Sequence, residues 1–115
     1  MKVLCVCDCN LNRSPTLEDY LKHCYPKAVV KSAGIMLMLL AGFECTYLDK
    51  SLALWADRIY VMENRQKEYI IKNYQIKKDI IFKLDIPDIY NRNDLELIKV
   101  FERRKNLGVF EGIED

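Results

Sequence analysis

A cysteine and an arginine six residues apart are the part of this sequence best suited to chemistry. Cys7 ends a short apolar run, and Arg13 precedes Ser14 and a segment with helical periodicity. The positive end of a helix dipole and a nearby guanidinium both favour a thiolate. A thiolate can attack phosphorus and form a phosphocysteine, while the planar arginine fork matches two phosphate oxygens. We therefore predict phosphate-ester chemistry, against the plainer alternative of a buried strand cysteine and a surface arginine.

The residues between this cysteine and this arginine should form an anion-binding loop. Backbone amides over residues 8–13, next to a helix N-terminus, can hydrogen-bond the remaining phosphate oxygens. Ser14 can donate to the Cys7 sulfur, or it can simply cap the helix. Asn10 tolerates a left-handed backbone and can brace the loop through its side chain. The phosphate-binding residues predicted in this way are Asp8, Cys9, Asn10, Leu11, Asn12, Arg13 and Ser14.

The same chemistry needs an acid that protonates the leaving oxygen and then acts as a base on water. Two carboxylates, Asp85 and Asp88, follow an apolar run, and Tyr90 places an aromatic ring beside them. We assign the acid to Asp88, a supporting role to Asp85, and stacking on a substrate ring to Tyr90. Turn formation alone is the simpler explanation of the two aspartates. His23 is expected on the solvated side of a helix and is not a candidate.

Hydrophobic periodicity predicts strands and helices in alternation. Helices are expected from Ser14 to Tyr25 and over residues 46–56. Two more should begin at Asn64 and Asn93, which we predict as their N-caps. Periodicity does not decide between helix and covered loop for the apolar stretch that begins at Ile35. The predicted strands occupy residues 2–6, 28–31, 57–62 and 80–84.

This alternation predicts an α/β fold in one domain over residues 1–115. The expected architecture is a four-stranded parallel sheet with helices on both faces, in three α/β/α layers. Ligands bind such sheets at the carboxyl ends of the strands. The Cys7 loop, Ser32 and the Asp88 loop each follow a strand, so we expect all three at the same rim.

Composition excludes several other classes of function. A net charge of +1 gives no overall field for nucleic acid. The longest apolar run, residues 35–41, is too short to span a bilayer, and no secretory leader is visible. Five cysteines, an odd number, argue against a disulfide framework, and a single histidine disfavours zinc. We expect a cytoplasmic protein, a monomer or a weak dimer, without nucleic-acid or membrane partners.

Four landmarks in order resemble those of low-molecular-weight protein tyrosine phosphatases. They are the Cys-x5-Arg-Ser-Pro loop of residues 7–15, Ser32-Ala33-Gly34, the Ala-Asp-x-apolar-x-x-Met strand of residues 56–62, and Pro87-Asp88-Ile89-Tyr90. The matches run from residue 2 to about residue 100, which is nearly the whole chain. The segment Leu-Asp-Ile-Pro-Asp is similar to that of a group of short bacterial tyrosine phosphatase-like proteins.

The resemblance implies a phosphomonoesterase that hydrolyses aryl phosphates through a phosphocysteine. It implies Cys7 as nucleophile, Arg13 as phosphate clamp and Asp88 as general acid and base. It also implies a hydrogen-bond network of Asn10, Ser14 and Ser32 that supports the loop. The implied substrate is a phosphotyrosine-containing protein or a small aryl phosphate, and no metal or cofactor is implied.

Three departures from the family pattern leave other functions open. Asp8 places a carboxylate in the loop, Cys9 stands where glycine is usual, and Ile89 replaces a proline. A non-catalytic phosphate- or phosphotyrosine-binding module on the same fold is therefore one alternative. An arsenate reductase is another, but it needs two further thiols, and Cys24 and Cys45 are poorly placed for a relay. A cysteine phosphocarrier domain is a third, and it needs neither the arginine nor the acid.

Overall fold

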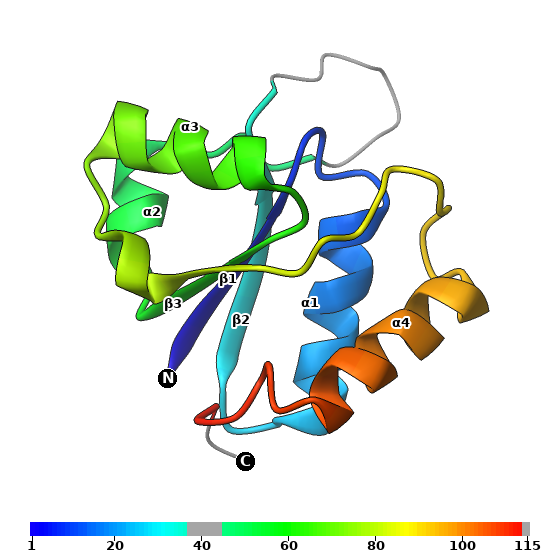
Figure 1. The fold of residues 1–115 in the computed structure, drawn as a ribbon. Helices are drawn as coiled ribbons and strands as arrows, with labels where there is room; N and C mark the ends of the chain where they lie inside the picture. Colours follow the sequence, from blue (N-terminus) through cyan, green and yellow to red (C-terminus); the bar gives the residue numbers. More distant parts are fainter. Residues whose placement is uncertain (37–44, 114–115) are drawn as a thin grey trace.

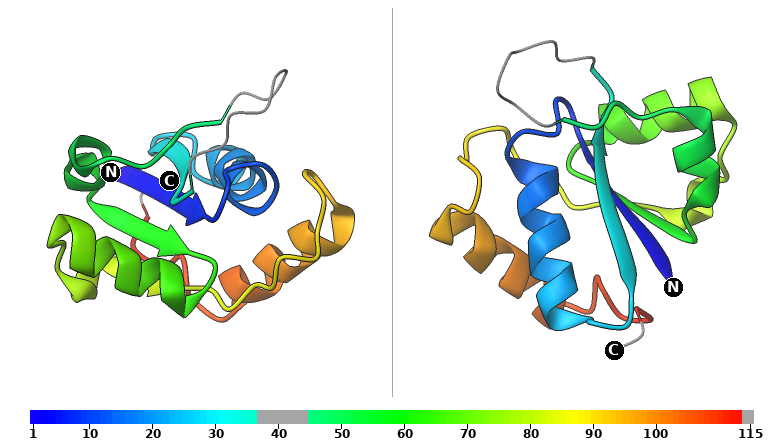
Figure 2. Two further views of the ribbon diagram at one scale, coloured as in Figure 1. Left: turned by 90° about the horizontal axis from the view of Figure 1, so that it is seen from above. Right: turned by 180° about the vertical axis from the view of Figure 1, so that it is seen from behind.

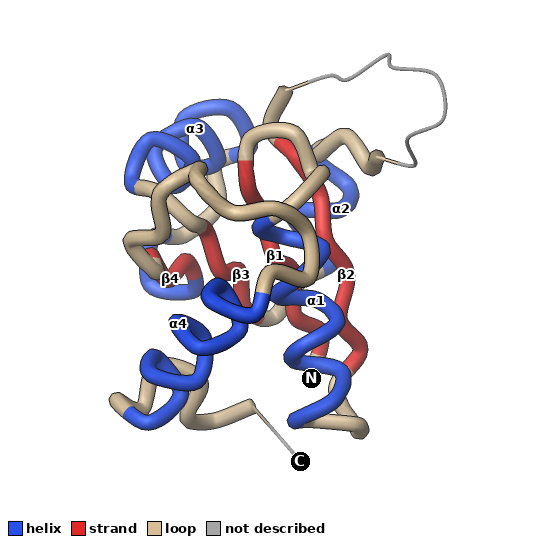
Figure 3. The backbone as a smooth tube through the Cα atoms, turned by 90° about the vertical axis from the view of Figure 1, so that its right-hand side faces the viewer, coloured by secondary structure: helices blue, strands red, loops and turns tan. Residues whose placement is uncertain are grey.

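The structure, a computed structural model, describes residues 1–36 and 45–113. The strands are β1 (Lys2–Cys7), β2 (Val29–Gly34), β3 (Arg58–Val61) and β4 (Ile81–Lys83). The helices are α1 (Arg13–Cys24), α2 (Lys50–Trp55), α3 (Asn64–Tyr74) and α4 (Leu95–Asn106), with a 3-10 turn at Lys78–Ile80. Figure 1 labels the four helices and the first three strands, and Figure 3 also labels β4. Most of the undecided apolar stretch lies in residues 37–44, outside the described ranges. No helix within those ranges is long and apolar enough to cross a membrane.

The four strands form one parallel sheet in the order β2-β1-β3-β4, which confirms the predicted fold class (Figure 3). From β1 the chain goes to β2 on one side and then crosses to β3 on the other. The strand order therefore reverses at β1. Loops leaving the carboxyl ends of β1 and β3 diverge at such a point, and open α/β sheets bind their ligands there. The segment that follows Cys7 thus starts where the topology favours a site.

Helices cover both faces of the sheet, as predicted. Helices α1 and α4 lie on one side and α2 and α3 on the other (Figure 2). Along β1, Val3, Cys5 and Cys7 point into the core under α1 and α4, while Leu4 and Val6 point into the core under α2 and α3. A strand buried on both faces reads as a continuous apolar run. This explains why β1 shows almost no alternation of polar and apolar residues.

The second predicted helix is wrong at its start. Residues 45–49 are not helical: the Gly34 N–H donates to the Thr46 carbonyl (2.8 Å), and the Leu48 N–H donates to the Gly34 carbonyl (2.8 Å). Helix α2 begins only after Asp49, whose carboxylate accepts from the Leu52 N–H at 2.7 Å. Leu48 is buried in the core under α2 and α3 although it lies outside the helix, because its backbone pairs with the end of β2.

The predicted N-caps of the last two helices are also wrong, each by one residue. Glu63, not Asn64, precedes α3, and its N–H donates to Oε1 of Gln66 at 3.0 Å. Asp94, not Asn93, caps α4, where its carboxylate accepts from a first-turn amide at 2.9 Å. Asn, Asp and Glu have similar local signals, so the sequence pattern locates the helix start but not the capping side chain.

Strand β2 is longer than predicted, and the extra length matters for the loop beside it. Its last three residues, Ser32 to Gly34, pair with Cys5 to Cys7 of β1. A Cβ atom on Gly34 would lie 2.7–2.8 Å from backbone atoms of Asp8, Cys9 and Asn10. Only glycine permits this close approach, and it brings β2 directly against the loop after β1.

Candidate active site

A cavity of about 80 Å³ lies at the carboxyl end of β1. It is lined by residues of the loop after β1 together with one carboxylate of the loop after β4. These residues are Cys7, Asp8, Cys9, Leu11, Asn12, Arg13 and Asp88. All seven belong to the set that the sequence predicts as a site. Within the described ranges, no group of three or more His, Cys, Asp and Glu side chains is arranged to hold a metal ion.

The Cys7 thiol is held by a hydroxyl. Cys7 is 3% exposed, and its sulfur is 3.0 Å from Oγ of Ser14, in the first turn of α1. The Ser14 oxygen accepts a hydrogen bond from the Asn10 amide at 3.0 Å. The hydroxyl proton can therefore point to the Cys7 sulfur or to the Ala33 carbonyl, which is more distant at 3.4 Å. This arrangement suits a thiolate, which can only accept.

Asn10 links the loop to its surroundings through every polar atom of its side chain. Its amide nitrogen donates to Oγ of Ser14 (3.0 Å) and to Oγ of Ser32 (2.9 Å), and its oxygen accepts from the Thr46 N–H (2.9 Å). The residue has a φ of 55°, the left-handed region that asparagine tolerates better than most residues. The predicted support residues Asn10, Ser14 and Ser32 thus form one connected network. Ser32 extends it by donating to Glu18 at 2.5 Å.

Arg13 is anchored on one side and open on the other. It is 1% exposed, and Nη1 donates both to Oε2 of Glu63 (3.0 Å) and to the Ile86 carbonyl (2.7 Å). Its Nε and Nη2 make no hydrogen bond to the described residues. They face Oδ1 of Asp88 at 3.7 Å and Oδ2 of Asp8 at 3.6 Å. The Nε–Nη2 edge, which can bind two oxygens at once, is the part of the guanidinium left for an anion.

The first turn of helix α1 adds backbone N–H donors beside the open edge of Arg13. Its N-cap residue, Asn12, makes no capping hydrogen bond with its side chain. The Asn12 oxygen instead accepts from the Arg92 N–H at 3.1 Å, which ties the loop after β4 to the loop after β1. The first amides of a helix need an acceptor. An anion over the start of α1 would supply it, with favourable alignment to the helix dipole.

Of the two candidate acids, Asp88 faces the cavity and Asp85 does not. Asp88 is 61% exposed and lies beside Nε of Arg13, so it has access both to solvent and to a bound group. Asp85 turns away, with a φ of 55° and its carboxylate 3.4 Å from Nζ of Lys83. The contact of Arg13 with Ile86 fixes the loop between these two aspartates.

Asp8, the unexpected carboxylate in the loop, is turned towards α3. It accepts two hydrogen bonds from Arg65, at 2.7 and 2.5 Å, and one from Nε2 of Gln66 at 3.0 Å. Burial opposes ionisation, but the hydrogen bonds from Arg65 and Gln66 and the charges of Arg65 and Arg13 outweigh it, so the pKa of Asp8 is lowered. Asp8 is therefore an ionised group whose charge is largely met by Arg65.

The remaining predicted side chains divide between the cavity and the core. Cys9, Leu11 and Asn12 line the cavity. Burial raises the pKa of the Cys9 thiol, and nearby negative charges add to the shift, so this second thiol is protonated near neutral pH. Tyr90 is partly buried against the core under α1 and α4. The proposed stacking of its ring on a substrate stays a prediction.

Sequence reasoning missed three side chains that follow β3. Glu63 anchors Arg13, while Arg65 and the fully buried Gln66 hold Asp8. A signal for them existed, because the carboxyl end of every parallel strand lies at the same rim. This shared rim, and not any local motif, marks the loop after β3 as part of the site.

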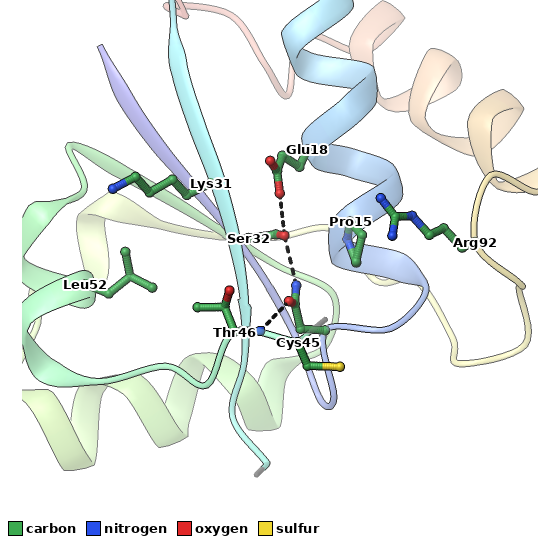
Figure 4. A pocket seen from close by; sticks show the side chains of 9 residues that line it. Pro15, Glu18, Lys31, Ser32, Cys45, Thr46, Leu52 and Arg92 are labelled. Atoms are coloured by element: carbon green, nitrogen blue, oxygen red, sulfur yellow. Dashed lines mark hydrogen bonds between the residues drawn. The ribbon is translucent and has the colours of Figure 1, made fainter. Parts of the chain in front are cut away.

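A second, larger cavity lies beside the supporting network rather than beside the nucleophile (Figure 4). It has a volume of about 760 Å³ and is lined by Asn10, Pro15, Glu18, Lys31, Ser32, Cys45, Thr46, Leu52 and Arg92. Its charged groups already have partners. Glu18 pairs with Lys22 (2.5 Å), Arg92 with Asp19 (3.6 Å), and Lys31 lies 4.5 Å above the centre of the Trp55 ring. The smaller cavity, which contains the thiol and the open arginine edge, is therefore the candidate site.

The chain is similar in sequence to a known phosphatase. The low-molecular-weight protein-tyrosine-phosphatase Ptp of Acinetobacter johnsonii is 29% identical, in an alignment that covers 79% of this chain and 81% of that protein. The resemblance to low-molecular-weight protein tyrosine phosphatases is confirmed. No family model matches the chain.

Solved structures of phosphatases share the fold. The tyrosine phosphatase Wzb from Escherichia coli K30, in complex with phosphate, has a TM-score of 0.78 and 23% identity over 94% of this chain and 95% of its own. The YwlE arginine phosphatase from Geobacillus stearothermophilus has a TM-score of 0.65 and 22% identity over 99% of each chain. At these identities the likeness shows a common fold alone.

Proposed function

We propose that this protein is a phosphomonoesterase that hydrolyses aryl phosphates through a phosphocysteine on Cys7. The observation that carries the proposal is that one small cavity holds a buried thiol, the open edge of Arg13 and the carboxylate of Asp88. These are the nucleophile, the phosphate clamp and the proton donor that two successive displacements need. The curated relative, named as a protein tyrosine phosphatase, supports the same reaction class.

In the first displacement, the Cys7 thiolate attacks phosphorus and the bond to the leaving oxygen breaks. The Nε–Nη2 edge of Arg13 binds two equatorial oxygens, and the amides at the start of α1 bind the third. Asp88, protonated at this stage, gives its proton to the leaving oxygen. The Asp88 carboxyl is largely exposed and borders the cavity, which suits an acid that must meet a departing group.

In the second displacement, water attacks the phosphocysteine and the phosphorus–sulfur bond breaks. The Asp88 carboxylate, now ionised, takes a proton from this water. The electron pair returns to the Cys7 sulfur, where the Ser14 hydroxyl at 3.0 Å can stabilise it by donating a hydrogen bond. Phosphate then leaves, and Asp88 holds the proton needed for the next turnover.

An aryl leaving group fits the side chains at the cavity better than a charged one. Leu11 supplies an aliphatic surface among the polar lining residues, and a phenyl ring packs favourably against it. Phosphotyrosine is therefore the proposed substrate class. One structural neighbour is named an arginine phosphatase, so phosphoarginine is the substrate to compare directly.

Aryl phosphate hydrolysis by single variants tests the proposal. We expect Cys7→Ser to abolish turnover, and Asp88→Asn to reduce it by roughly 10²- to 10⁴-fold because general acid catalysis is lost. Asp85→Asn is the matched control, since Asp85 faces Lys83 instead of the cavity, and it should retain wild-type activity. Full activity of Cys7→Ser would rule out the mechanism.

Two further measurements would favour the alternatives. Binding of phosphotyrosine without hydrolysis would identify a non-catalytic binding module. Thiol-dependent reduction of arsenate would identify an arsenate reductase. For that role Cys24 is badly placed, because it packs against the core under α1 and α4.

A further inference from the structure

Asp8 and an incoming phosphate would approach the same part of Arg13. The Nη1 atom of Arg13 is occupied by Glu63 and Ile86, so an anion must use the Nε–Nη2 edge. Oδ2 of Asp8 already lies 3.6 Å from Nη2. An unmasked carboxylate at that distance would repel a phosphate dianion and also compete with it for the guanidinium.

Arg65 lies where it removes this conflict. Its two terminal nitrogens donate to the two oxygens of Asp8, and Nη2 also contacts Glu63 at 2.8 Å. Gln66 donates to the same carboxylate from a fully buried position, with its oxygen fixed by the backbone N–H groups of Met62 and Glu63. Asp8 is thus held towards α3 by two donor side chains, of which only Arg65 carries a positive charge.

We propose that Arg65 is a positioning residue that masks the charge of Asp8, and that this mask allows phosphate to bind the Nε–Nη2 edge of Arg13. The proposal rests on the proposed function only in taking this cavity as the phosphate site. The ion network of the site contains more negative than positive groups. Its carboxylates are those of Asp8, Glu63 and Asp88, and its guanidiniums are those of Arg13 and Arg65. Phosphate affinity therefore depends strongly on each of the two positive charges.

This mechanism differs from direct phosphate binding by Arg65, and a double-mutant cycle separates the two. If Arg65 acts through Asp8, its removal matters only while residue 8 is charged. If Arg65 binds phosphate itself, its removal matters in either background. The two variants needed are Arg65→Gln and Asp8→Asn, which remove one charge each and keep a similar side-chain size.

Binding of inorganic phosphate to the full chain, measured by titration calorimetry, is the test. We expect Arg65→Gln to weaken binding about tenfold, because the carboxylate of Asp8 then loses its positively charged partner and repels the phosphate. Asp8→Asn should bind phosphate at least as tightly as wild type. The double variant should return to within about threefold of wild type. Arg103→Gln, the same charge change on the exposed side of α4, is the control and should leave binding unchanged.

Two results would overturn the inference: unchanged binding in Arg65→Gln, or an equal loss from Arg65→Gln in the Asp8→Asn background. If the chain hydrolyses aryl phosphates, Arg65→Gln should raise KM and leave kcat nearly unchanged, which a general loss of structure would not do. Phosphate binding that shows the coupling without any turnover would contradict the proposed function and leave this inference standing. Turnover without the coupling would support the proposed function and contradict this inference.

Discussion

At the scale of single residues, the site is organised by side chains that serve other side chains. Asn10 does not line the cavity that contains the thiol and the carboxylate. Its side chain nevertheless orients Ser14 and connects it to β2 through Ser32. Its amide has one arrangement that satisfies all three bonds, because both serine oxygens need a donor and the Thr46 N–H needs an acceptor. The loop around Cys7 is therefore preorganised before any ligand binds.

Asp8 gives a pH-dependent contribution to stability that can be measured. Its pKa in the folded protein lies below the usual value of 3.8 because of Arg65 and Gln66. A carboxyl with a lowered pKa stabilises the folded state fully above its unfolded pKa, and this stabilisation is lost as pH falls through the folded pKa. We predict that the stability difference between wild type and Asp8→Asn is constant above about pH 5 and shrinks below about pH 4.

Urea unfolding of the two proteins between pH 3 and pH 6 provides the measurement. The variant retains a hydrogen-bonding side chain, so part of the interaction with Gln66 can persist. Parallel stability curves down to pH 3 would show that Asp8 is not ionised differently in the folded and unfolded states, and would remove the basis for charge masking by Arg65.

At the scale of elements, the sequence predicts what local periodicity and alternation determine. The parallel sheet, the order of strands and helices, and the positions of Cys7, Arg13 and Asp88 at one rim follow from such patterns. The start of α2 does not, because Thr46 and Leu48 are held by hydrogen bonds to the distant Gly34. Hydrogen bonds between distant segments are invisible to a periodicity argument.

The contribution of the residues after β3 could not be predicted from the sequence for a similar reason. Glu63 and Arg65 look like ordinary charged residues at a helix start, and nothing local marks them as partners of Arg13 and Asp8. Their roles depend on the strand order, which places β3 beside β1. Topology predicts that their loop reaches the rim, but only the structure shows which side chains meet there.

Gly34 offers a prediction at this scale, since it is the point where β2 touches the loop. In Gly34→Ala, the new methyl group would lie within 2.8 Å of three backbone atoms, which cannot move aside as a flexible side chain can. We expect a loss of about 1–3 kcal/mol in the free energy of unfolding. We also expect loss of phosphatase activity in the remaining folded protein, because the loop must shift.

The matched comparison is Gly108→Ala, at the end of α4 and far from the loop in sequence. Gly108 has a φ of +85°, so alanine there should cost about 1–2 kcal/mol through backbone strain. A Cβ atom there would lie 3.4 Å from the flexible carboxylate of Glu111. Activity per folded molecule should therefore be kept. Equal activity in both variants would show that the loop tolerates displacement.

At the scale of the whole molecule, the site joins segments that are far apart in the sequence. Arg13 on α1 contacts Glu63 after β3 and Ile86 after β4, while Asn10 contacts Ser32 on β2. Each contact crosses between loops that the parallel sheet brings to one rim. An anion bound by the β1 loop and Arg13 therefore depends on the position of all four strands, so its binding should be coupled to global unfolding.

This coupling predicts a large thermal stabilisation by phosphate. A ligand that binds only the folded state at 100 times its Kd adds about 2.7 kcal/mol of stability. For a chain of 115 residues, this corresponds to a rise in Tm of about 10 °C. Arg13→Lys should lose most of the rise, since a lysine keeps the charge but not the two-point edge. Calorimetric scans with phosphate, and with chloride at equal ionic strength, supply the measurement and its control. An equal rise for wild type and Arg13→Lys would mean that phosphate binds elsewhere, and the coupling between the Arg13 edge and the fold would have to be abandoned.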